Sequence, residues 1–490
     1  MIKINYANAR PLDVHRWSDY SEVNIFVNEI YNDLKSIEGN EGISKKLVKV
    51  ILLDLYVAWC ADHSLMLMFS RDNNAYKAKS RYNELHIGKK IIGIIDALVK
   101  DGVIGQKKGF KDRISGIGFQ SRLWATNKLK AHFETVKFSQ FVINRNEDWD
   151  PIILRDKDKK NKEYDDTVET NRMRSVLLDY SKILENTHID IYDLDTPVLT
   201  VGTKKRTMRL QINQQDKLVR RVFNNLRWDQ GGRFYGGWWQ RCPKDYRKKI
   251  KMDGIMTAEV DFSGLHIVLL YAEEGINYWA EVNEDPYQLH GINDIDFLAV
   301  VFGAAKLLLL TAINSDDRKK TFQAFRAQSK AGTPEKKMTN EQLASMLAAL
   351  SNKHAPIAHK LASGAGIDLM YVDSRITEKL IEKFTYEHHC PMLTVHDSYI
   401  VPFGYDHILH QEMQAAFEQV TGVSHPVVEH TTEYFDMIEQ EPDPDNPVEL
   451  EHDHYGGPPS QRHLTELELF REFKTKPQRE DWVPDWTMVY

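Results

Sequence analysis

Two aspartates, Asp261 and Asp397, each follow a short β-prone run, and 136 residues separate them in the chain. A carboxylate at the end of a buried strand is costly unless a positive group neutralises it, and a divalent metal ion is a common partner. If the fold brings the two carboxylates together, they would hold two Mg²⁺ ions about 4 Å apart, the arrangement that serves in-line nucleotidyl transfer. The alternative is that both aspartates are turn or helix N-cap residues. We predict that they form a catalytic metal-binding pair.

The residues around the pair resemble conserved segments of one polymerase family. The segment DFSGLH at residues 261–266 resembles motif A of family A DNA polymerases, Asp-x-Ser-x-x-Glu. The segment VHDS at residues 395–398 resembles their motif C, His-Asp-Glu, and is closer still to the His-Asp-Ser of phage-type single-subunit RNA polymerases. The glycine-rich segment at 232–237 is similar to their Thr-Gly-Arg segment. The resemblance covers residues 231–430, and the order of the motifs makes it informative.

The resemblance implies a role for each matching residue. Asp261 and Asp397, with the main-chain carbonyl of Phe262, would bind two Mg²⁺ or Mn²⁺ ions. The residues expected at the primer end and the incoming nucleotide are Arg233, Arg247, His266 and His396. His266 occupies the position of the motif A glutamate, which in the family crowds the ribose 2′ position.

The fingers helix of the family, Arg-x-x-x-Lys-x-x-x-Phe/Tyr, is matched only in part. Lys306 fits the lysine and is our preferred catalytic cation, but Phe302 and Leu310 stand at the arginine and aromatic positions. A second register uses the basic run at 318–320 instead. The register therefore stays open, with Lys306 favoured.

Near the N-terminus a basic region predicts a winged helix-turn-helix. Residues 73–130 contain 13 Lys/Arg against 4 Asp/Glu, an excess of 9 positive charges. We expect helices over 75–85 and 89–100, then a hairpin with strands at 103–108 and 119–126. In such modules the second helix enters the major groove and the wing contacts phosphate. The predicted DNA contacts are Lys89, Lys90, Lys107, Lys108, Lys111, Arg113 and Arg122. The alternative is a module for protein contacts whose charges form a solvated face.

Between and beyond these motifs, helical periodicity predicts further elements. Buried or amphipathic helices are expected in 1–40 and over 45–59, 170–184, 213–228, 296–314, 342–350 and 376–384. The helices over 170–184 and 213–228 occupy the position of a thumb. The charge-mixed run at 155–166 is predicted to be a linker or a mobile loop, and 331–339 a loop. The segment 231–240 has four aromatic residues that can stack on bases, or it is a hairpin packed on the core.

The C-terminal residues 433–490 contain 15 acidic against 5 basic residues, which makes them strongly negative. With their many prolines they predict an extended tail. Trp482, Trp486 and Tyr490 near its end are candidates for docking on the body of the protein or on a protein partner.

Composition limits the class of protein. The chain of 490 residues is 42% hydrophobic and 28% charged, and its net charge of −7 is unevenly distributed. It contains no run of 18 apolar residues and no signal peptide, so we expect a cytoplasmic protein with no membrane partner. The only cysteines, Cys60, Cys242 and Cys390, are far apart, and we expect neither a disulfide framework nor a structural zinc site.

Together these features predict an α+β protein. We expect a winged-helix domain at 1–140, a linker with thumb-like helices at 141–230, and palm and fingers with an antiparallel palm sheet at 231–432, before the tail at 433–490. The predicted function is that of a template-directed DNA polymerase that takes primer–template DNA and nucleoside triphosphates. The alternatives are a non-catalytic replication initiator or regulator with a degenerate polymerase body, and an RNA-making primase or RNA polymerase.

Overall fold

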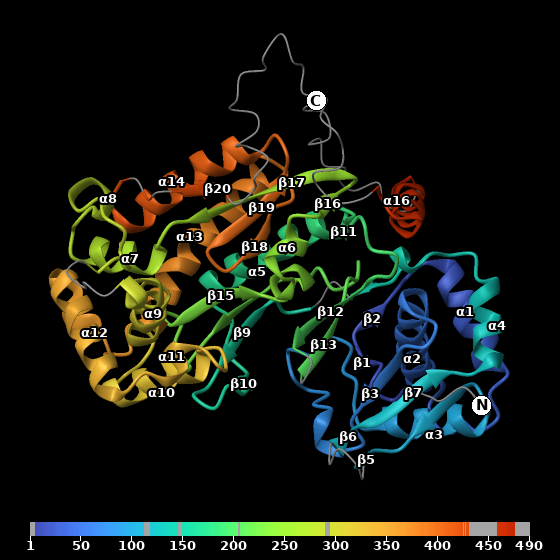
Figure 1. The fold of residues 1–490 in the computed structure, drawn as a ribbon. Coiled ribbons are helices and arrows are strands. Elements are labelled where there is room, and N and C mark those ends of the chain that lie inside the picture. The colour runs from blue at the N-terminus through green and yellow to red at the C-terminus, as the bar shows by residue number, and fades with distance from the viewer. Residues whose placement is uncertain are drawn as a thin grey trace.

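The computed structural model of the chain has a mixed α+β architecture with mainly antiparallel sheets (Figure 1). It describes residues 5–111, 118–145, 149–203, 206–289, 295–424, 426, 428–430 and 458–475. Among these residues the buried apolar side chains form two clusters, one built from residues 23–143 with two C-terminal phenylalanines, and one from residues 152–417. No helix in the described ranges has the length and apolar character needed to span a membrane.

The N-terminal unit packs helices against a four-stranded sheet of order β1-β3-β7-β4. Its helices are α1 (Ser21–Asn32), α2 (Glu41–Ala61), α3 (Lys90–Lys100) and α4 (Asn127–Thr135). Its main strands are β1 (Ala9–Pro11), β3 (Met66–Phe69), β4 (Ile104–Lys107) and β7 (Ser121–Ala125). Smaller pairs are formed by β2 (Arg16–Trp17) with β8 (Asn144–Arg145) and by β5 (Phe110–Lys111) with β6 (Gly118–Phe119). The helix α2 is buried along most of its length because its sequence is apolar on nearly every side.

The predicted helix-turn-helix is correct only in its second half. The helix α3 and the antiparallel hairpin of β4 and β7 lie where the sequence placed them. The first helix, expected over 75–85, is absent: the chain there forms a short 3₁₀ turn, Asn73–Ala75, and a series of tight turns. The Asn83 side chain donates to the carbonyls of Lys77 and Ile87 and accepts from the Ile87 amide. Such side-chain bonds to the backbone compete with a helix.

A second sheet, of order β10-β9-β14-β15, follows the N-terminal unit. It consists of β9 (Ile152–Arg155), β10 (Asn161–Lys162), β14 (Arg220–Phe223) and β15 (Gly231–Tyr235). The run at 155–166 is therefore not a linker: residues 156–160 form the loop of the β9–β10 hairpin, and β10 follows within the run. The helix predicted over 213–228 is also wrong, because Arg221 pairs across the interior with Glu378 and this segment runs as β14. The β12–β13 hairpin (Val198–Thr203 and Arg206–Gln211) and helix α5 (Val168–Glu185) complete this region.

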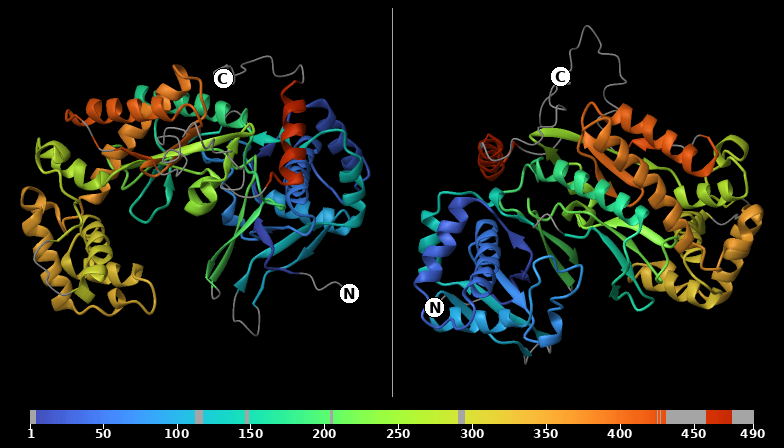
Figure 2. Two further views of the ribbon diagram at one scale, coloured as in Figure 1. Left: turned by 45° about the horizontal axis from the view of Figure 1, so that its top comes forward. Right: turned by 180° about the vertical axis from the view of Figure 1, so that it is seen from behind.

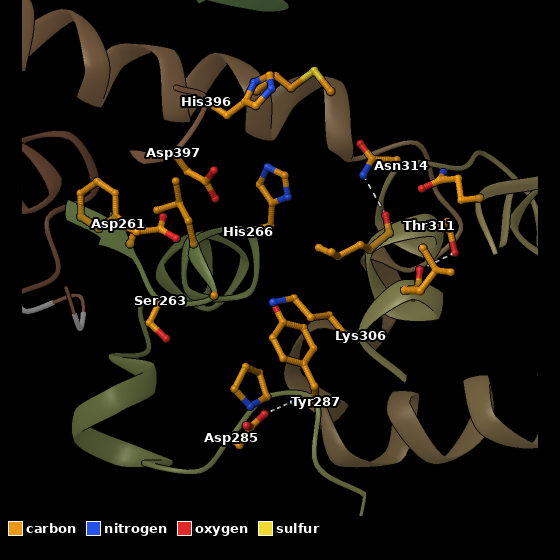
Figure 3. Close-up of a pocket in the computed structure, with 18 of the residues that line it drawn as sticks. Asp261, Ser263, His266, Asp285, Tyr287, Lys306, Thr311, Asn314, His396 and Asp397 are labelled. Atoms are coloured by element: carbon orange, nitrogen blue, oxygen red, sulfur yellow. Dashed lines mark hydrogen bonds between the residues drawn. The ribbon is translucent and has the colours of Figure 1, made fainter. Parts of the chain in front are cut away.

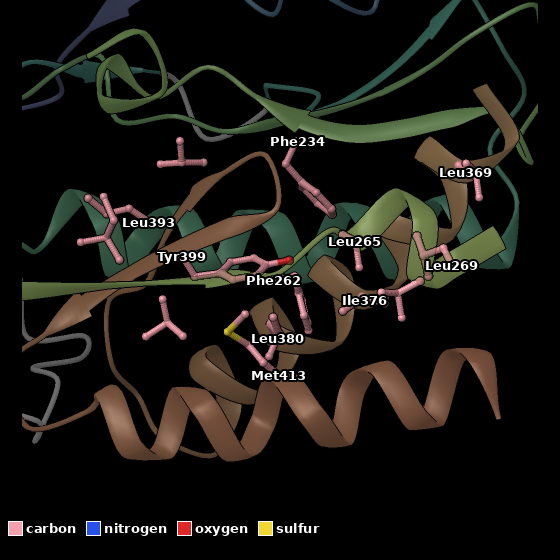
Figure 4. Close-up of a cluster of buried hydrophobic side chains, with 14 of the residues drawn as sticks. Phe234, Phe262, Leu265, Leu269, Leu369, Ile376, Leu380, Leu393, Tyr399 and Met413 are labelled. Carbon is pink, nitrogen blue, oxygen red and sulfur yellow. The ribbon is translucent and has the colours of Figure 1, made fainter. Parts of the chain in front are cut away.

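The largest sheet has six strands and lies at the centre of the molecule (Figure 1). Its order is β11-β16-β17-β19-β18, with β20 paired to β17. The strands are β11 (Ile189–Ile191), β16 (Ile250–Met252), β17 (Ile255–Phe262), β18 (Leu393–Val395), β19 (Ser398–Pro402) and β20 (Val428–His430). Helices α7 (Leu265–Glu273), α13 (Gly366–Tyr386) and α14 (Asp406–Thr421) pack with it. Figure 4 shows Phe262 and Tyr399 of the strands in one apolar cluster with Ile376 and Leu380 of α13 and Met413 of α14.

A group of helices lies on the side of this sheet away from the N-terminal unit (Figure 1). It contains α9 (Ile295–Ile313), α10 (Arg318–Gln328), α11 (Pro334–Lys337) and α12 (Asn340–Lys353). The helices α10 and α12 both pack against α9. The loop predicted at 331–339 contains the short helix α11, which begins at a proline, as the first turn of a helix permits. Short elements before and after the group are α8 (Tyr278–Glu281) and the 3₁₀ turn Ala355–Lys360.

The C-terminal region is not extended throughout. Most of residues 433–490 lie outside the described residues, including Trp482, Trp486 and Tyr490, but α16 (Gln461–Lys474) is a regular helix. All the views in Figures 1 and 2 place it beside the N-terminal helices. Its Phe470 and Phe473 are buried in the N-terminal apolar cluster, so this helix packs against the N-terminal unit.

Candidate active site

Asp261 lies near the end of β17, where the chain turns into α7. Between them, Ser263 and Gly264 form the turn, and Gly264 has a φ of +65°, a left-handed conformation that favours glycine. A Cβ on this glycine would meet Pro286 at 3.4 Å. The helix α7 then buries its apolar residues, which fixes the strand end and its aspartate in the molecule.

Asp397 lies in the two-residue turn between β18 and β19. Val395 pairs with Ser398, so His396 and Asp397 alone form the turn, and His396 has a φ of +56°. The register of β17 with β19 places Asp261 opposite Ser398, the residue next to Asp397. The end of β17 and the β18–β19 turn therefore bring the two predicted metal ligands close together, and Figure 3 shows their carboxylates on the same wall of a pocket.

This pocket has a volume of about 1070 Å³ and opens between the central sheet and the α9–α10 helices. It brings together most of the residues predicted from the motifs: Asp261, Phe262, His266, Lys306, Arg233, His396 and Asp397. Their chain positions span 165 residues, from 233 to 397, so the fold rather than local sequence assembles the site.

Arg233 reaches the pocket from β15, where it is held by two partners. Its Nε donates to Oδ2 of Asp373 on α13 at 2.7 Å, and its Nη2 donates to Nε2 of His266 at 2.9 Å. Because Nε2 accepts this bond, the neutral ring of His266 carries its proton on Nδ1. Burial, with the Arg233 charge, lowers the pKa of His266 to about 4, so the ring is neutral at pH 7. Gly232, with a φ of +72°, allows β15 to approach α13 closely.

Lys306 projects from α9 on the side of the pocket opposite the two aspartates (Figure 3). Its Nζ lies 5.0 Å from the centre of the Tyr287 ring. Burial, with the charges of Asp397, Asp285 and Asp261, raises the pKa of Tyr287 to about 12. The tyrosine therefore remains a neutral hydroxyl beside the carboxylates.

The structure favours the Lys306 register of the fingers motif over the basic run at 318–320. Residues of that run do not line the pocket, and Lys320 pairs with Asp316 at 2.7 Å. Leu310 lines the pocket where the family has an aromatic residue, while the side chain of Phe302 is outside the described residues. Tyr287, from the loop before α9, supplies an aromatic ring from a different part of the chain.

Arg247 does not line the pocket, so its predicted contact with nucleotide or primer is not supported by the geometry. Its guanidinium pairs with Glu259 at 2.7 Å, and the Ser398 hydroxyl donates to the same carboxylate at 2.8 Å. An acid at position 398, as in the family motif, would face Glu259 and repel it. The serine and the arginine together neutralise and hold this carboxylate on β17, away from the pocket.

In the glycine-rich segment at 231–240, one residue lines the pocket and two tryptophans belong to the core. Arg233 faces the pocket, but Trp238 and Trp239 are fully buried, and the Trp239 indole donates to the Thr394 carbonyl at 3.1 Å. These two rings cannot stack on bases, so that prediction is wrong for them. Tyr235 is 39% exposed and remains accessible.

The predicted DNA-contacting residues of the N-terminal unit differ in exposure. Lys89, Lys90, Lys107 and Lys108 are exposed. Arg122 is 4% exposed and donates to the carbonyls of Tyr6 and Gln120, so it stabilises the unit and its predicted phosphate contact is wrong. Arg113 and the side chain of Lys111 lie outside the described residues.

Sequence reasoning missed two residues of the site, Tyr287 and Asp373. Asp373 lies on the buried face of α13 with Leu369, Ile376 and Leu380, and it is 1% exposed. A carboxylate on an otherwise apolar helical stripe was a signal in the sequence, because such a group needs a partner. Tyr287 had no comparable signal, since it follows a proline in a loop and approaches the aspartates only in the folded chain.

The donors at the pocket wall are carboxylate and carbonyl oxygens, the ligands that Mg²⁺ and Mn²⁺ prefer. A second group with metal-binding side chains, His188, Asp190 and Glu466, lies elsewhere, at the edge of the central sheet.

No model of a known protein family matches the sequence, and no curated protein matches it.

Proposed function

We propose that this chain is a template-directed nucleotidyltransferase, and specifically a DNA polymerase that uses two divalent cations. The observation that carries the proposal is that Asp261 at the end of β17 and Asp397 in the adjoining β18–β19 turn line one pocket with Arg233 and Lys306. Two acids and two cations around an open cavity match the charges of a nucleoside triphosphate with its metal ions.

The metal-binding residues in this proposal are Asp261, Asp397 and the carbonyl of Phe262. Mg²⁺ ions bound there would activate the primer hydroxyl for attack and neutralise the charge of the pyrophosphate leaving group. Asp261 and Asp397 would hold these ions at the reacting end of the nucleotide. His396, in the turn beside Asp397 and in the lining of the pocket, would contact the primer end.

Lys306 and Arg233 have the complementary role of binding the triphosphate. Lys306 faces the aspartates from α9, so a nucleotide between them would contact both walls. Arg233 is oriented by Asp373 and carries a fixed positive charge next to the neutral His266. A cavity of about 1070 Å³ has room for one nucleotide.

DNA binding by the N-terminal unit is the second part of the proposal. The exposed Lys89, Lys90, Lys107 and Lys108 lie at the start of α3 and in the β4 hairpin. Their charges favour phosphate contacts, which do not depend on base sequence. This unit would bring template DNA to the pocket.

The deciding experiment is extension of a labelled primer on a template, with either deoxynucleotides or ribonucleotides and with Mg²⁺ or Mn²⁺. The proposal expects template-dependent addition of deoxynucleotides, lost when the metal is chelated. Duplex binding without addition on any template would instead favour the non-catalytic initiator or regulator. Addition of ribonucleotides alone would favour an RNA-making enzyme.

A further inference from the structure

The group formed by His188, Asp190 and Glu466 lies outside the pocket, and its three side chains converge from separate elements. His188 and Asp190 are two residues apart at the start of β11, which places them on one face of the strand. Glu466 comes from α16, far away in the sequence. One ligand atom from each side chain lies within 4.8 Å of the others.

His188 is the residue that distinguishes this group from an ordinary acidic cluster. It is 0% exposed, and neither of its ring nitrogens has a hydrogen-bond partner among the residues described by the structure. An unsatisfied buried polar group costs about 1–3 kcal/mol, so native proteins seldom retain one without a ligand or a role. The rings of Phe141 and Phe470 surround it and exclude water from one side.

The carboxylate of Asp190 is already oriented by two neighbours. Arg462 donates to both of its oxygens, at 3.0 and 2.9 Å, and the His463 Nδ1 lies 2.7 Å from its Oδ2. Partners of this kind, behind the ligand atoms, fix the ligands in protein metal sites. Arg462 also pairs with Oε2 of Glu466 at 2.9 Å, so one arginine holds both acids toward the histidine.

We propose that His188, Asp190 and Glu466 form a binding site for a divalent transition-metal ion such as Zn²⁺. An imidazole nitrogen with carboxylate oxygens is a ligand set that suits zinc. In a tetrahedral site with metal–ligand distances of about 2.0–2.2 Å, the donors are closer together than 4.8 Å, so the flexible Glu466 side chain would move inward on binding. The expectation that the chain has no structural zinc site, which rested on cysteine and histidine spacing, is revised by this proposal.

The site would be structural, because its ligands come from two segments that are far apart in the chain, the start of the central sheet and the helix α16. The helix α16 contributes Glu466 to the metal and buries Phe470 and Phe473 in the N-terminal cluster. The ion would therefore fasten the N-terminal unit, through α16, to the edge of the central sheet.

The test uses the full-length protein, stripped of metal and then incubated with Zn²⁺ alone. After removal of unbound ion, the zinc content is measured by mass spectrometry and the Tm by calorimetry. We expect one bound zinc ion per chain, both in the wild type and in the Asp261→Asn/Asp397→Asn double variant. We also expect the Tm of the metal-free protein to rise when zinc is restored.

Two variants remove one proposed ligand each, and a third variant, which removes a histidine outside the site, is the control. His188→Asn and Glu466→Gln should each lose the ion and the zinc-dependent rise in Tm. If His188→Asn fails to fold, the result for Glu466→Gln decides whether the site exists. This substitution keeps the shape of the side chain and lies on the surface of α16 that faces the site. His359→Gln, at a histidine whose side chain is 59% exposed, should keep the ion. Absence of bound zinc in the wild type, zinc that is lost with Asp261 and Asp397, or full retention by Glu466→Gln would each overturn the proposal.

Discussion

Arg233 and Asp373 form an ion pair, with 2.7 Å between Nε and Oδ2, that joins β15 to α13 beneath the pocket. The guanidinium is 15% and the carboxylate 2% exposed, so the pair is largely shielded from water. Since Arg233 also donates to His266, the orientation of both pocket residues depends on Asp373. Asp373 is thus a positioning residue that does not itself line the pocket.

The first prediction concerns the pH dependence of activity through this pair. Burial raises the pKa of Asp373 to about 6, so the carboxylate orients Arg233 fully only above that pH. We expect Asp373→Asn to lower kcat/KM about 10- to 100-fold, the range expected for a hydrogen bond between charged groups. The rise of wild-type kcat/KM through pH 6 should flatten in the variant. An unchanged pH profile would show that Asp373 does not act through Arg233.

The same shift predicts an effect on stability. A carboxyl whose pKa is raised in the folded state binds its proton more tightly there, so its contribution to stability is present at low pH and lost as the pH rises from about 4 through 6. Asparagine does not titrate. The unfolding free energy of Asp373→Asn relative to wild type should therefore increase by up to about 3 kcal/mol between pH 4 and pH 7, measured by urea denaturation. A constant difference would contradict the raised pKa.

The third prediction distinguishes a basic residue that stabilises the fold, Arg247, from one that would bind substrate, Lys306. Arg247 pairs with the nearly buried Glu259, whereas Lys306 is exposed in the pocket. Arg247→Ala should lower the unfolding free energy by about 3 kcal/mol, because it leaves Glu259 with an uncompensated charge. Lys306→Ala should leave stability nearly unchanged and raise the KM for nucleotide about 10- to 100-fold. The reverse pattern, measured by denaturation and steady-state kinetics, would exchange the two roles.

Several parts of the fold were predictable from the sequence, and the failures have physical causes. The helices α3 and α5 could be predicted because each buries an apolar stripe that repeats along the sequence, and α2 and α9 because each is a long apolar run. The segment at 213–228 was mistaken for a helix because the buried pairing of Arg221 with Glu378 overrides local periodicity. Such a long-range pair has no local signature.

The site shows the same division. Asp261 and Asp397 could be identified because each ends a β-prone run in a recognisable segment. Arg247 was assigned to the nucleotide because only its position in the sequence was known, whereas its partner Glu259 is a strand neighbour of Asp261. The sequence could not predict that Tyr287 and Asp373 belong to the site, because distant segments of the chain bring them to it only in the folded protein.

Sugar selection provides a fourth prediction. His266 stands at the position of the glutamate in the family A motif that residues 261–266 resemble. Its ring is neutral and accepts a hydrogen bond from Arg233. We expect a DNA polymerase with weak discrimination that also inserts some ribonucleotides. His266→Glu should raise the preference for deoxynucleotides by about 1–3 kcal/mol in the ratio of kcat/KM values. If the ratio does not change, His266 does not face the sugar.

DNA binding gives the fifth prediction, and the structure determines its design. Because Phe470 and Phe473 complete the N-terminal cluster and Arg16 pairs with Asp216, the full chain is the right material, not a fragment ending near residue 140. Changing Lys89, Lys107 and Lys108 to Glu should weaken duplex binding and reduce the slope of log K against log salt by about 1 per lost contact. Lys45→Glu on α2, where Lys45 lies near Glu41, is the matched control. Binding that is insensitive to salt would indicate a protein-contact role for this unit.

The central claim is that Asp261 and Asp397 carry out catalysis together. It is tested most directly by single-turnover primer extension with the wild type, Asp261→Asn and Asp397→Asn at saturating Mg²⁺, with duplex binding measured in parallel. Since bound metal ions supply several kcal/mol of transition-state stabilisation, each variant should extend the primer at least about 1000-fold more slowly and bind DNA as the wild type does. Extension at the wild-type rate by either variant would contradict the account.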